Sequence, residues 1–522
     1  MPRSRWYAAA LVFTVPLLFA FFTNHVWEDY YITFRASKNL AEGHGLVYQL
    51  GERVHSFTSP LGVLLPAALS FVTRSDAATL WCFRLLCCAA LAGTALVLWQ
   101  LLEARGASRL TCWFVTVALL AESKLVDFTI NGMETAFMVL FGAALLKAML
   151  QEPKPRAWRL GAILGGLMWT RPDAFVFGAA IIASSMIFTL RSRRAFGETI
   201  RLLLISGCWA ALIYGPWVLW AWWYYGSPVP NTIIAKSGGI PNGLGWSFLW
   251  EAPFTYLKGG SNMEWLMNPS YYFMGGWSDV MIRVSGALAV LAGFLWLVPR
   301  LPLVVRVTSF ALFLGSYYLQ AIPPAPWYFP FWYVLAAVSL GGAAAWSLER
   351  LQAGGMPRKL VRTGLLVVFA LQAATVPLVA LQTRYQQQIV ENRGRRLIGE
   401  WLAAHASPND TVFLEPLGYI GYFSQCHMLD FPGLSAPRVI AARRKLGETY
   451  RAVIPELHPT WIVLRARFSS NILLQGSRIL DGYDLVQTWD VSHELEAISV
   501  LPGRGLLDYD SSYVIFRRRA AP

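Results

Sequence analysis

The chain has 522 residues, of which 56% are hydrophobic and only 14% are charged, and its mean hydropathy is +0.44. Because soluble domains usually carry about 25% charged residues, this composition predicts a polytopic membrane protein and excludes an ordinary soluble one. The net charge of +14 comes largely from Lys and Arg in short loops between apolar runs, a placement that indicates membrane topology and contact with anionic membrane lipids, and no nucleic acid.

The first apolar run extends from Trp6 to Val26, which is long enough to cross a hydrocarbon core of about 30 Å. It has no small-residue cleavage site, so we expect a retained helix and not a removed signal peptide. Arg3 and Arg5 precede it, and the positive-inside tendency therefore predicts a cytoplasmic N-terminus. The run ends beside an acidic pair at the outer membrane surface.

This pair is Glu28 and Asp29. Placing an ionised side chain at a membrane surface costs free energy unless it has a binding partner or a function, so the pair predicts a functional site. The alternative is a helix cap or a solvated acidic patch. One carboxylate can take the proton of an attacking hydroxyl as a general base. The hard oxygens of both also suit Mg²⁺, Mn²⁺ or Ca²⁺ as a metal site. No P-loop, HExxH or cysteine-based zinc spacing indicates another cofactor.

Residues 27–77 are expected to form the first outer loop, with a surface helix after the acidic pair and a short apolar helix over 58–73 that lies on the membrane or re-enters it. Further spans are expected at 78–102, 109–123, 134–150, 158–170, 174–190, 200–224, 280–298, 304–322, 330–347 and 360–382. With the first helix they make about eleven spans, an odd number that predicts an extracytoplasmic C-terminus.

The short outer loops, one of which is expected from Asp127 to Thr135, hold few basic residues, chiefly Lys124 and Arg171, as the positive-inside tendency predicts. Arg171 lies in a tight turn between two spans, and Lys236 lies in a long outer loop over residues 226–279. Asp173 is a ready partner for Arg171, but both bases also suit a lipid phosphate, to which Arg offers two parallel hydrogen bonds and Lys a point charge.

Three other side chains near the outer surface have two interpretations each. Trp327 and Tyr328 are either residues of an interfacial aromatic belt or rings that hold an isoprenoid chain or a sugar. His55 is either a hydrogen-bonding loop residue or a substrate ligand.

From about residue 384 the composition becomes that of a soluble domain, which divides the chain into a membrane domain (1–383) and an extracytoplasmic α/β domain (384–522). A helix is expected over Asn392–His405. Strands are expected over Thr411–Glu415, His427–Asp430, Trp461–Arg465, Leu485–Val491 and Tyr513–Arg517.

Several short segments along the chain form a recognisable set: Glu28-Asp29-Tyr-Tyr-Ile-Thr-Phe-Arg35, Gly43-His-Gly45-Leu-Val-Tyr, Gly51-Glu-Arg53-Val, Thr58-Ser59-Pro60-Leu, Asn131-Gly-Met-Glu134-Thr, Arg171-Pro-Asp173, Pro230-Asn231-Thr and Gly421-Tyr-Phe-Ser. Together they resemble the GT-C superfamily of polyprenyl-phosphate-sugar-dependent glycosyltransferases. The closest similarity is to the branch that contains the actinobacterial terminal arabinofuranosyltransferases. The resemblance covers nearly the whole chain and is much less specific for the sugar than for the superfamily.

The resemblance implies a GT-C fold and an inverting transfer of a sugar, such as arabinofuranose, from a polyprenyl-phosphate donor to a glycan or glycolipid of the cell envelope. The reaction would take place on the periplasmic face of a bacterial inner membrane, with Glu28 or Asp29 as the base. The branch usually has two Asp here, and Glu28 departs from it by one methylene, so the role of base could shift to Asp29.

The resemblance carries over Glu134, Arg171, Asn231 and Lys236, and the residues at the outer surface add further candidates for binding. The donor phosphate and lipid would contact Arg35, Arg171, Lys236, Trp327 and Tyr328. The remaining substrate-binding residues would be His55, Glu134, Asn231 and Glu415.

Other activities remain compatible with the sequence. Within the enzymes, the alternative is transfer of another sugar, such as a hexose or an aminopentose, to lipid A, O-antigen or protein. In a different class, the chain could be a flippase for lipid-linked sugars or a non-catalytic scaffold. Flippases tend to have symmetric repeats, which the sequence lacks, and the one-sided distribution of its polar residues favours an enzyme.

Overall fold

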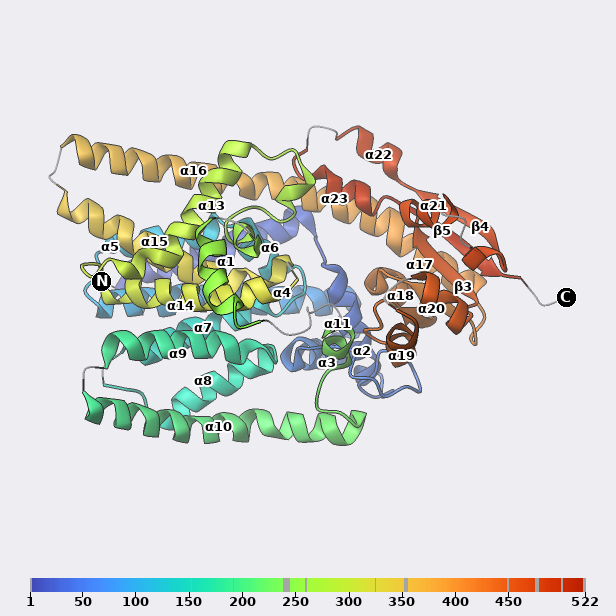
Figure 1. Cartoon of the computed structure of the whole chain (residues 1–522), viewed down its shortest axis with the longest axis horizontal. Helices are drawn as coiled ribbons and strands as arrows, with labels where there is room; N and C mark the ends of the chain where they lie inside the picture. Colours follow the sequence, from blue (N-terminus) through green and yellow to red (C-terminus); the bar gives the residue numbers. More distant parts are fainter. Residues whose placement is uncertain are drawn as a thin grey trace.

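The computed structural model describes all residues except 1, 152, 191, 238–244, 259–260, 324, 352–354, 448–449, 475–477, 499–500 and 520–522. A body of long, roughly aligned helices occupies most of the molecule, and a domain with a small sheet covers one end of it (Figure 1). The first described helix begins at the opposite end of the body, and the last described strand, over residues 512–518, lies in the sheet (Figure 1).

The helices of the body are α1 (Pro2–Thr23), α2 (Glu28–Ala41), α3 (Pro60–Thr73), α4 (Asp76–Ala104), α5 (Arg109–Leu120), α6 (Ser123–Ile130), α7 (Thr135–Leu150), α8 (Ala157–Thr170), α9 (Ala174–Thr189), α10 (Arg193–Tyr225), α11 (Asn231–Ser237), α12 (Phe248–Leu257), α13 (Asp279–Phe294), α14 (Leu303–Ala321), α15 (Pro330–Arg350) and α16 (Met356–Tyr385). Short 3-10 turns, η1 (Ser261–Leu266), η2 (Tyr272–Met274), η3 (Leu295–Leu297) and η4 (Pro326–Tyr328), lie between them.

Seven described helices, α1, α4, α10, α13, α14, α15 and α16, are long and apolar enough to cross a membrane. Each of the eleven expected spans is helical, and the four others correspond to the shorter helices α5, α7, α8 and α9. The chain is therefore a multi-pass membrane protein. The expected surface or re-entrant segment is α3, a 14-residue apolar helix beside α2.

Helices α6 and α7 meet at an angle of 117°. The sequence predicted an outer loop from Asp127 to Thr135, whereas the structure has a buried helix up to Ile130. Charge pairing explains how this segment is buried: Asp127 binds His25 at 2.7 Å, and Lys124 binds Glu122 at 2.5 Å. Lys124, expected at the outer surface, is fully buried.

The C-terminal domain has five strands, β1 (Thr411–Leu414), β2 (His427–Asp430), β3 (Trp461–Arg465), β4 (Tyr483–Asp490) and β5 (Ser512–Arg518), in the order β2-β1-β3-β5-β4. Strands β1, β2 and β3 are parallel, and β5 pairs antiparallel with β3 and β4. The α/β domain predicted from the sequence is confirmed, and all five strands overlap the expected ranges.

The helices of this domain are α17 (Leu397–His405), α18 (Leu417–Ser424), α19 (Pro437–Leu446), α20 (Tyr450–Leu457), α21 (Ala466–Leu474), η6 (Arg478–Leu480), α22 (Ser492–Glu496) and α23 (Arg504–Tyr509). Successive residues of β1 alternate between two apolar cores: Val412 and Leu414 pack with α17 and α18, and Phe413 packs with α19 and α20. The central strands are therefore buried on both faces, which explains the unbroken apolar run of β3.

A continuous helix joins the two parts of the molecule. Helix α16 passes through a π-helical segment, η5 (Gln386–Arg396), into α17, so that residues 356–405 form one rod. The domain boundary predicted at residue 384 falls inside this rod. Segment η5 carries Glu391 and Arg395, which lie buried at the junction between the membrane body and the C-terminal domain.

Candidate active site

Helix α2 carries the acidic pair into the junction between the body and the C-terminal domain. It begins at Glu28, directly after the extended residue Trp27, and its first-turn carboxylates suit the positive end of the helix dipole. Tyr30 and Phe34 bury one face of the helix against Tyr419 and Tyr422 of α18. Consecutive helical residues point about 100° apart, and Glu28 and Asp29 consequently have different surroundings.

The Asp29 carboxylate has no hydrogen bond or ion pair with any residue that the structure describes. Burial raises its pKa above the ordinary value, and the positive charges of Lys236 and Arg171 act in the opposite direction. Among the described residues the Asp29 carboxylate is thus unpaired and lies within electrostatic reach of two cations, an arrangement that suits an anion-binding site.

Arg171 is held in place from two sides. Its guanidinium donates two hydrogen bonds to Asp173, at 2.9 and 3.1 Å, and lies 5.0 Å from the centre of the Tyr328 ring. Asp173 also accepts a hydrogen bond from the Tyr318 hydroxyl. The two interpretations of Arg171, a partner for Asp173 and a basic group near the acidic pair, are therefore compatible.

Lys236 lies on α11, with its ammonium group 5.9 Å from the centre of the Trp327 ring. Trp327 is in edge contact with Trp27, whose ring also stacks on Tyr271 at 6.3 Å. Aromatic rings from three separate segments therefore lie between Lys236 and the start of α2.

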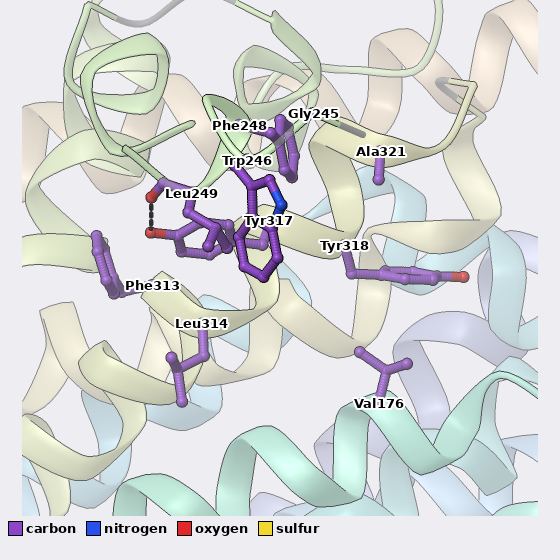
Figure 2. Close-up of a pocket in the computed structure, with 10 residues that line it drawn as sticks. All are labelled: Val176, Gly245, Trp246, Phe248, Leu249, Phe313, Leu314, Tyr317, Tyr318 and Ala321. Atoms are coloured by element: carbon purple, nitrogen blue, oxygen red, sulfur yellow. Dashed lines mark hydrogen bonds between the residues drawn. The ribbon is translucent and has the colours of Figure 1, made fainter. Parts of the chain in front are cut away.

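An apolar cavity of about 770 Å³ lies between α9, α14 and the segment that leads into α12. Figure 2 shows its lining residues Val176, Gly245, Trp246, Phe248, Leu249, Phe313, Leu314, Tyr317, Tyr318 and Ala321. The Tyr318 hydroxyl points away from the other lining residues in Figure 2, and it is the group that binds Asp173. One tyrosine therefore connects the apolar cavity to the polar cluster around Arg171.

Unlike Asp29, Glu28 contacts other groups of the protein with both carboxylate oxygens. One of its oxygens accepts a hydrogen bond from the backbone N–H of Gly418 at 3.1 Å, and the other lies 3.8 Å from Arg395. Burial raises the pKa of Glu28 to about 7; Arg395 opposes the shift, and Glu391, Asp29 and Asp510 add to it. Glu28 thus connects α2 to the C-terminal domain.

The Glu28 contact is one end of a charged network. Arg395 pairs with Glu391 at 2.8 Å and with Asp510 at 2.5 Å, and Asp510 pairs with Arg465 at 2.5 Å. Arg465 in turn binds Glu415. Glu415, predicted as a substrate ligand, therefore lies in an ion-pair network inside the C-terminal domain, and we do not include it in the candidate site.

Two further predicted ligands are bound to protein groups. Arg35 is buried, donates to the carbonyls of Gly421 and Cys426 and lies 4.4 Å from the Tyr48 ring, so it connects α2 to α18. The Asn231 side chain donates to carbonyls in the C-terminal domain. Both side chains are used in contacts with the C-terminal domain, and their roles in substrate binding stay predictions.

His55 and Glu134 are buried. His55 stacks on Tyr225 at 4.7 Å, neither ring nitrogen has a partner in the described part of the chain, and burial lowers its pKa to about 4. His55 is therefore neutral at physiological pH. Glu134 lies at the α6–α7 bend, where its charge interacts with Arg171 and Asp29.

Among the described residues, no group of three or more His, Cys, Asp or Glu is arranged to hold a metal ion. Asp29 lies within electrostatic reach of the basic groups of Lys236 and Arg171 as well as of the acidic Glu134, and the two Glu28 oxygens face Gly418 and Arg395. These surroundings suit an anion better than Mg²⁺, Mn²⁺ or Ca²⁺.

Sequence reasoning missed three groups of this region, Trp27, Tyr271 and Tyr318. Trp27 could have been noticed because it directly precedes the acidic pair. Tyr271 and Tyr318 have no such signal, because each is one aromatic residue among the 21 Tyr of an aromatic-rich chain.

Comparisons with known proteins give a fold and no family for the whole chain. A family described as a domain of unknown function (DUF8728) matches residues 380–516. No curated protein matches the sequence.

The structure is similar to that of ArnT from Cupriavidus metallidurans bound to undecaprenyl phosphate, with a TM-score of 0.52 and 13% identity over 99% of this chain and 98% of that one. It is also similar to an oligosaccharyltransferase from Archaeoglobus fulgidus in complex with Zn and sulfate, with a TM-score of 0.55 and 12% identity over 94% of this chain and 72% of that one. AftD, an arabinofuranosyltransferase from Mycobacteria, aligns at 13% identity over 100% of this chain and 40% of its own, with a TM-score of 0.49 that supports no inference. The chain therefore has the GT-C fold, as the sequence predicted.

Proposed function

We propose that this protein is an inverting glycosyltransferase in which Asp29 is the general base and Arg171 and Lys236 bind the phosphate of a polyprenyl-phosphate sugar. The observation that carries the proposal is the unpaired Asp29 carboxylate beside two cations at one end of a GT-C fold. A catalytic base must have its oxygens free to accept a proton, and Asp29 meets this requirement better than Glu28.

In the proposed reaction, the oxygen of an acceptor hydroxyl attacks the anomeric carbon of the donor sugar while Asp29 takes the hydroxyl proton. The bond between the anomeric carbon and the phosphate oxygen breaks on the opposite face, and its electron pair leaves with the polyprenyl phosphate. Lys236 and Arg171 stabilise the charge that develops on the departing phosphate. The configuration at the anomeric carbon is inverted, and Asp29 then releases its proton to water.

The apolar cavity beside Tyr318 fits the start of an isoprenoid chain. Its lining is almost entirely hydrocarbon and aromatic, and it is connected through Tyr318 and Asp173 to Arg171. A lipid in the cavity would therefore have its phosphate near the basic groups. The undecaprenyl phosphate bound to ArnT, a protein of the same fold, supports a polyprenyl donor.

The proposed setting is the periplasmic side of a bacterial inner membrane, with the N-terminus in the cytoplasm and the C-terminal domain outside. Nucleotide sugars are unavailable there, which requires a lipid-linked donor. The acceptor would be a cell-envelope glycan or glycolipid and the sugar a pentose such as arabinofuranose, with lipid A, O-antigen or protein as alternative acceptors.

The experiment is to incubate purified protein in detergent with a panel of polyprenyl-phosphate sugars and candidate acceptors, and to measure released polyprenyl phosphate and glycosylated product. Release that requires both substrates supports the enzyme. Movement of a lipid-linked sugar across a vesicle membrane, with no release for any donor, would instead support a flippase and overturn the proposal.

A further inference from the structure

Helix α11, which carries Lys236, is attached to the C-terminal domain. The side chain of Asn231 donates to the carbonyls of Gly433 and Leu434, at 2.8 and 3.0 Å. The guanidinium of Arg443, on α19, donates to the carbonyl of Ala235 at 2.9 Å. The domain thus binds α11 at its first residue and at the residue directly before Lys236.

This attachment matters because α11 has only seven residues. A helix of that length is unstable on its own, since one turn fixes many dihedral angles for few hydrogen bonds. On the body side, the backbone N–H of Asn231 binds the carbonyl of His55 at 2.8 Å. The hydrogen bonds to the C-terminal domain therefore contribute strongly to holding α11 in place.

The attaching surface of the domain is itself rigid. The buried Asp430 carboxylate accepts hydrogen bonds from the backbone N–H groups of Gly433, Leu434 and Ser435, at 3.1, 2.5 and 2.8 Å, and from the Ser435 hydroxyl at 2.7 Å. These bonds fix the turn whose carbonyls bind Asn231. We refer to Asn231, Asp430 and Arg443 as the α11 bracket.

The side chain of Lys236 is exposed, and in the described part of the chain its ammonium group contacts only the Trp327 ring, whose centre is 5.9 Å away. Its ammonium group therefore depends on the backbone of α11 for its position. A shift of this backbone would move the positive charge away from Asp29 without changing any residue of the proposed catalytic cluster.

We propose that the α11 bracket is a positioning device through which the C-terminal domain holds Lys236 at the donor phosphate. The inference rests on the proposed function, because it takes Lys236 as a phosphate ligand. It assigns Asn231 and Arg443 a role in donor binding that acts through Lys236 and not through contact with a substrate.

The test is a double-mutant cycle on the full-length protein, with binding of undecaprenyl phosphate in detergent as the measurement. Arg443→Ala is expected to weaken binding by about tenfold, as is typical for loss of a hydrogen bond to a charged group. In a Lys236→Ala background the same substitution is expected to change binding by less than about twofold, because no ammonium group remains to be positioned.

Arg444→Ala is the matched control, since Arg444 is the exposed neighbour of Arg443 on α19. Asn231→Ala removes the bracket contact that α11 itself provides. It is the variant to measure if Arg443→Ala lowers the yield of folded protein. Both bracket substitutions are expected to raise the KM for the donor and to leave the KM for the acceptor unchanged.

Equal losses of affinity from Arg443→Ala, and from Asn231→Ala, in the wild-type and Lys236→Ala backgrounds would overturn the inference and leave the proposed function standing. Failure of the wild-type protein to bind undecaprenyl phosphate would overturn both.

Discussion

The proposed difference in role between Glu28, which contacts the C-terminal domain, and Asp29, the general base, gives the most direct prediction. Asp29→Asn keeps the size of the side chain and removes its ability to take a proton. Loss of a general base typically costs a factor of about 10² to 10⁴ in rate, so turnover is expected to fall at least about a hundredfold while donor binding persists. Glu28→Gln is the matched substitution one residue earlier on the same helix.

The effect of Glu28→Gln can be estimated from its contacts. The amide oxygen of Gln can still accept the hydrogen bond from Gly418, and only the 3.8 Å contact with Arg395 is lost. Arg395 keeps its shorter pairs with Glu391 and Asp510. A weak, partly exposed ion pair contributes about 1 kcal/mol or less, so the rate is expected to change by less than about tenfold.

The assay measures release of polyprenyl phosphate at saturating donor and acceptor over pH 4 to 9. The wild-type rate should rise with pH through a pKa above that of an ordinary Asp, because burial raises the pKa of Asp29 and only its ionised form accepts a proton. A Glu28→Gln variant that folds, binds donor and yet loses as much turnover as Asp29→Asn would refute this assignment.

Three further predictions concern the donor site and the junction. Arg171→Lys keeps the charge but not the paired hydrogen bonds to Asp173, so the KM for the donor should rise about tenfold in steady-state assays. Leu314→Trp should partly fill the apolar cavity and weaken binding of a long-chain polyprenyl phosphate more than that of a two-isoprene analogue, and equal loss for both would argue against a lipid in this cavity. Because the pKa of Glu28 is raised, the folded state binds the Glu28 proton more tightly than the unfolded state does. The free energy of unfolding should therefore fall by up to about 3 kcal/mol as the pH rises from about 4.5 through about 7. Glu28→Gln should remove this part of the pH dependence.

Much of the fold could be predicted because membrane spans and strands have local signals. Apolar runs identified the helices of the body, and short runs rich in apolar and aromatic residues identified the five strands. The α6–α7 region could not be predicted in this way, because its polar residues indicate an outer loop. Its burial depends on distant partners such as His25 for Asp127, and pairings of that range have no signature in the local sequence.

The candidate site was predictable in part for a similar reason. The acidic pair, Arg171 and Lys236 are conspicuous charges at membrane-surface positions, and the structure places Arg171 and Lys236 within electrostatic reach of Asp29. Arg35, Asn231 and Glu415 are equally conspicuous but contact protein groups across or within the C-terminal domain. Sequence alone shows that a polar side chain needs a partner and does not show whether that partner is a substrate or another part of the chain.

The two acidic residues present opposite arguments for the role of base. Glu28, with a pKa of about 7, has the more suitable acidity for proton transfer near neutral pH, but Gly418 and Arg395 face its oxygens. Burial raises the pKa of Asp29 as well, and its carboxylate has no hydrogen bond or ion pair among the described residues and lies within electrostatic reach of both basic groups. Position decides, because a base that cannot reach the proton contributes nothing whatever its pKa. The extra methylene of Glu28 then has a structural explanation: it extends the carboxylate from α2 to the first turn of α18, where an Asp side chain would be too short to make the same contact.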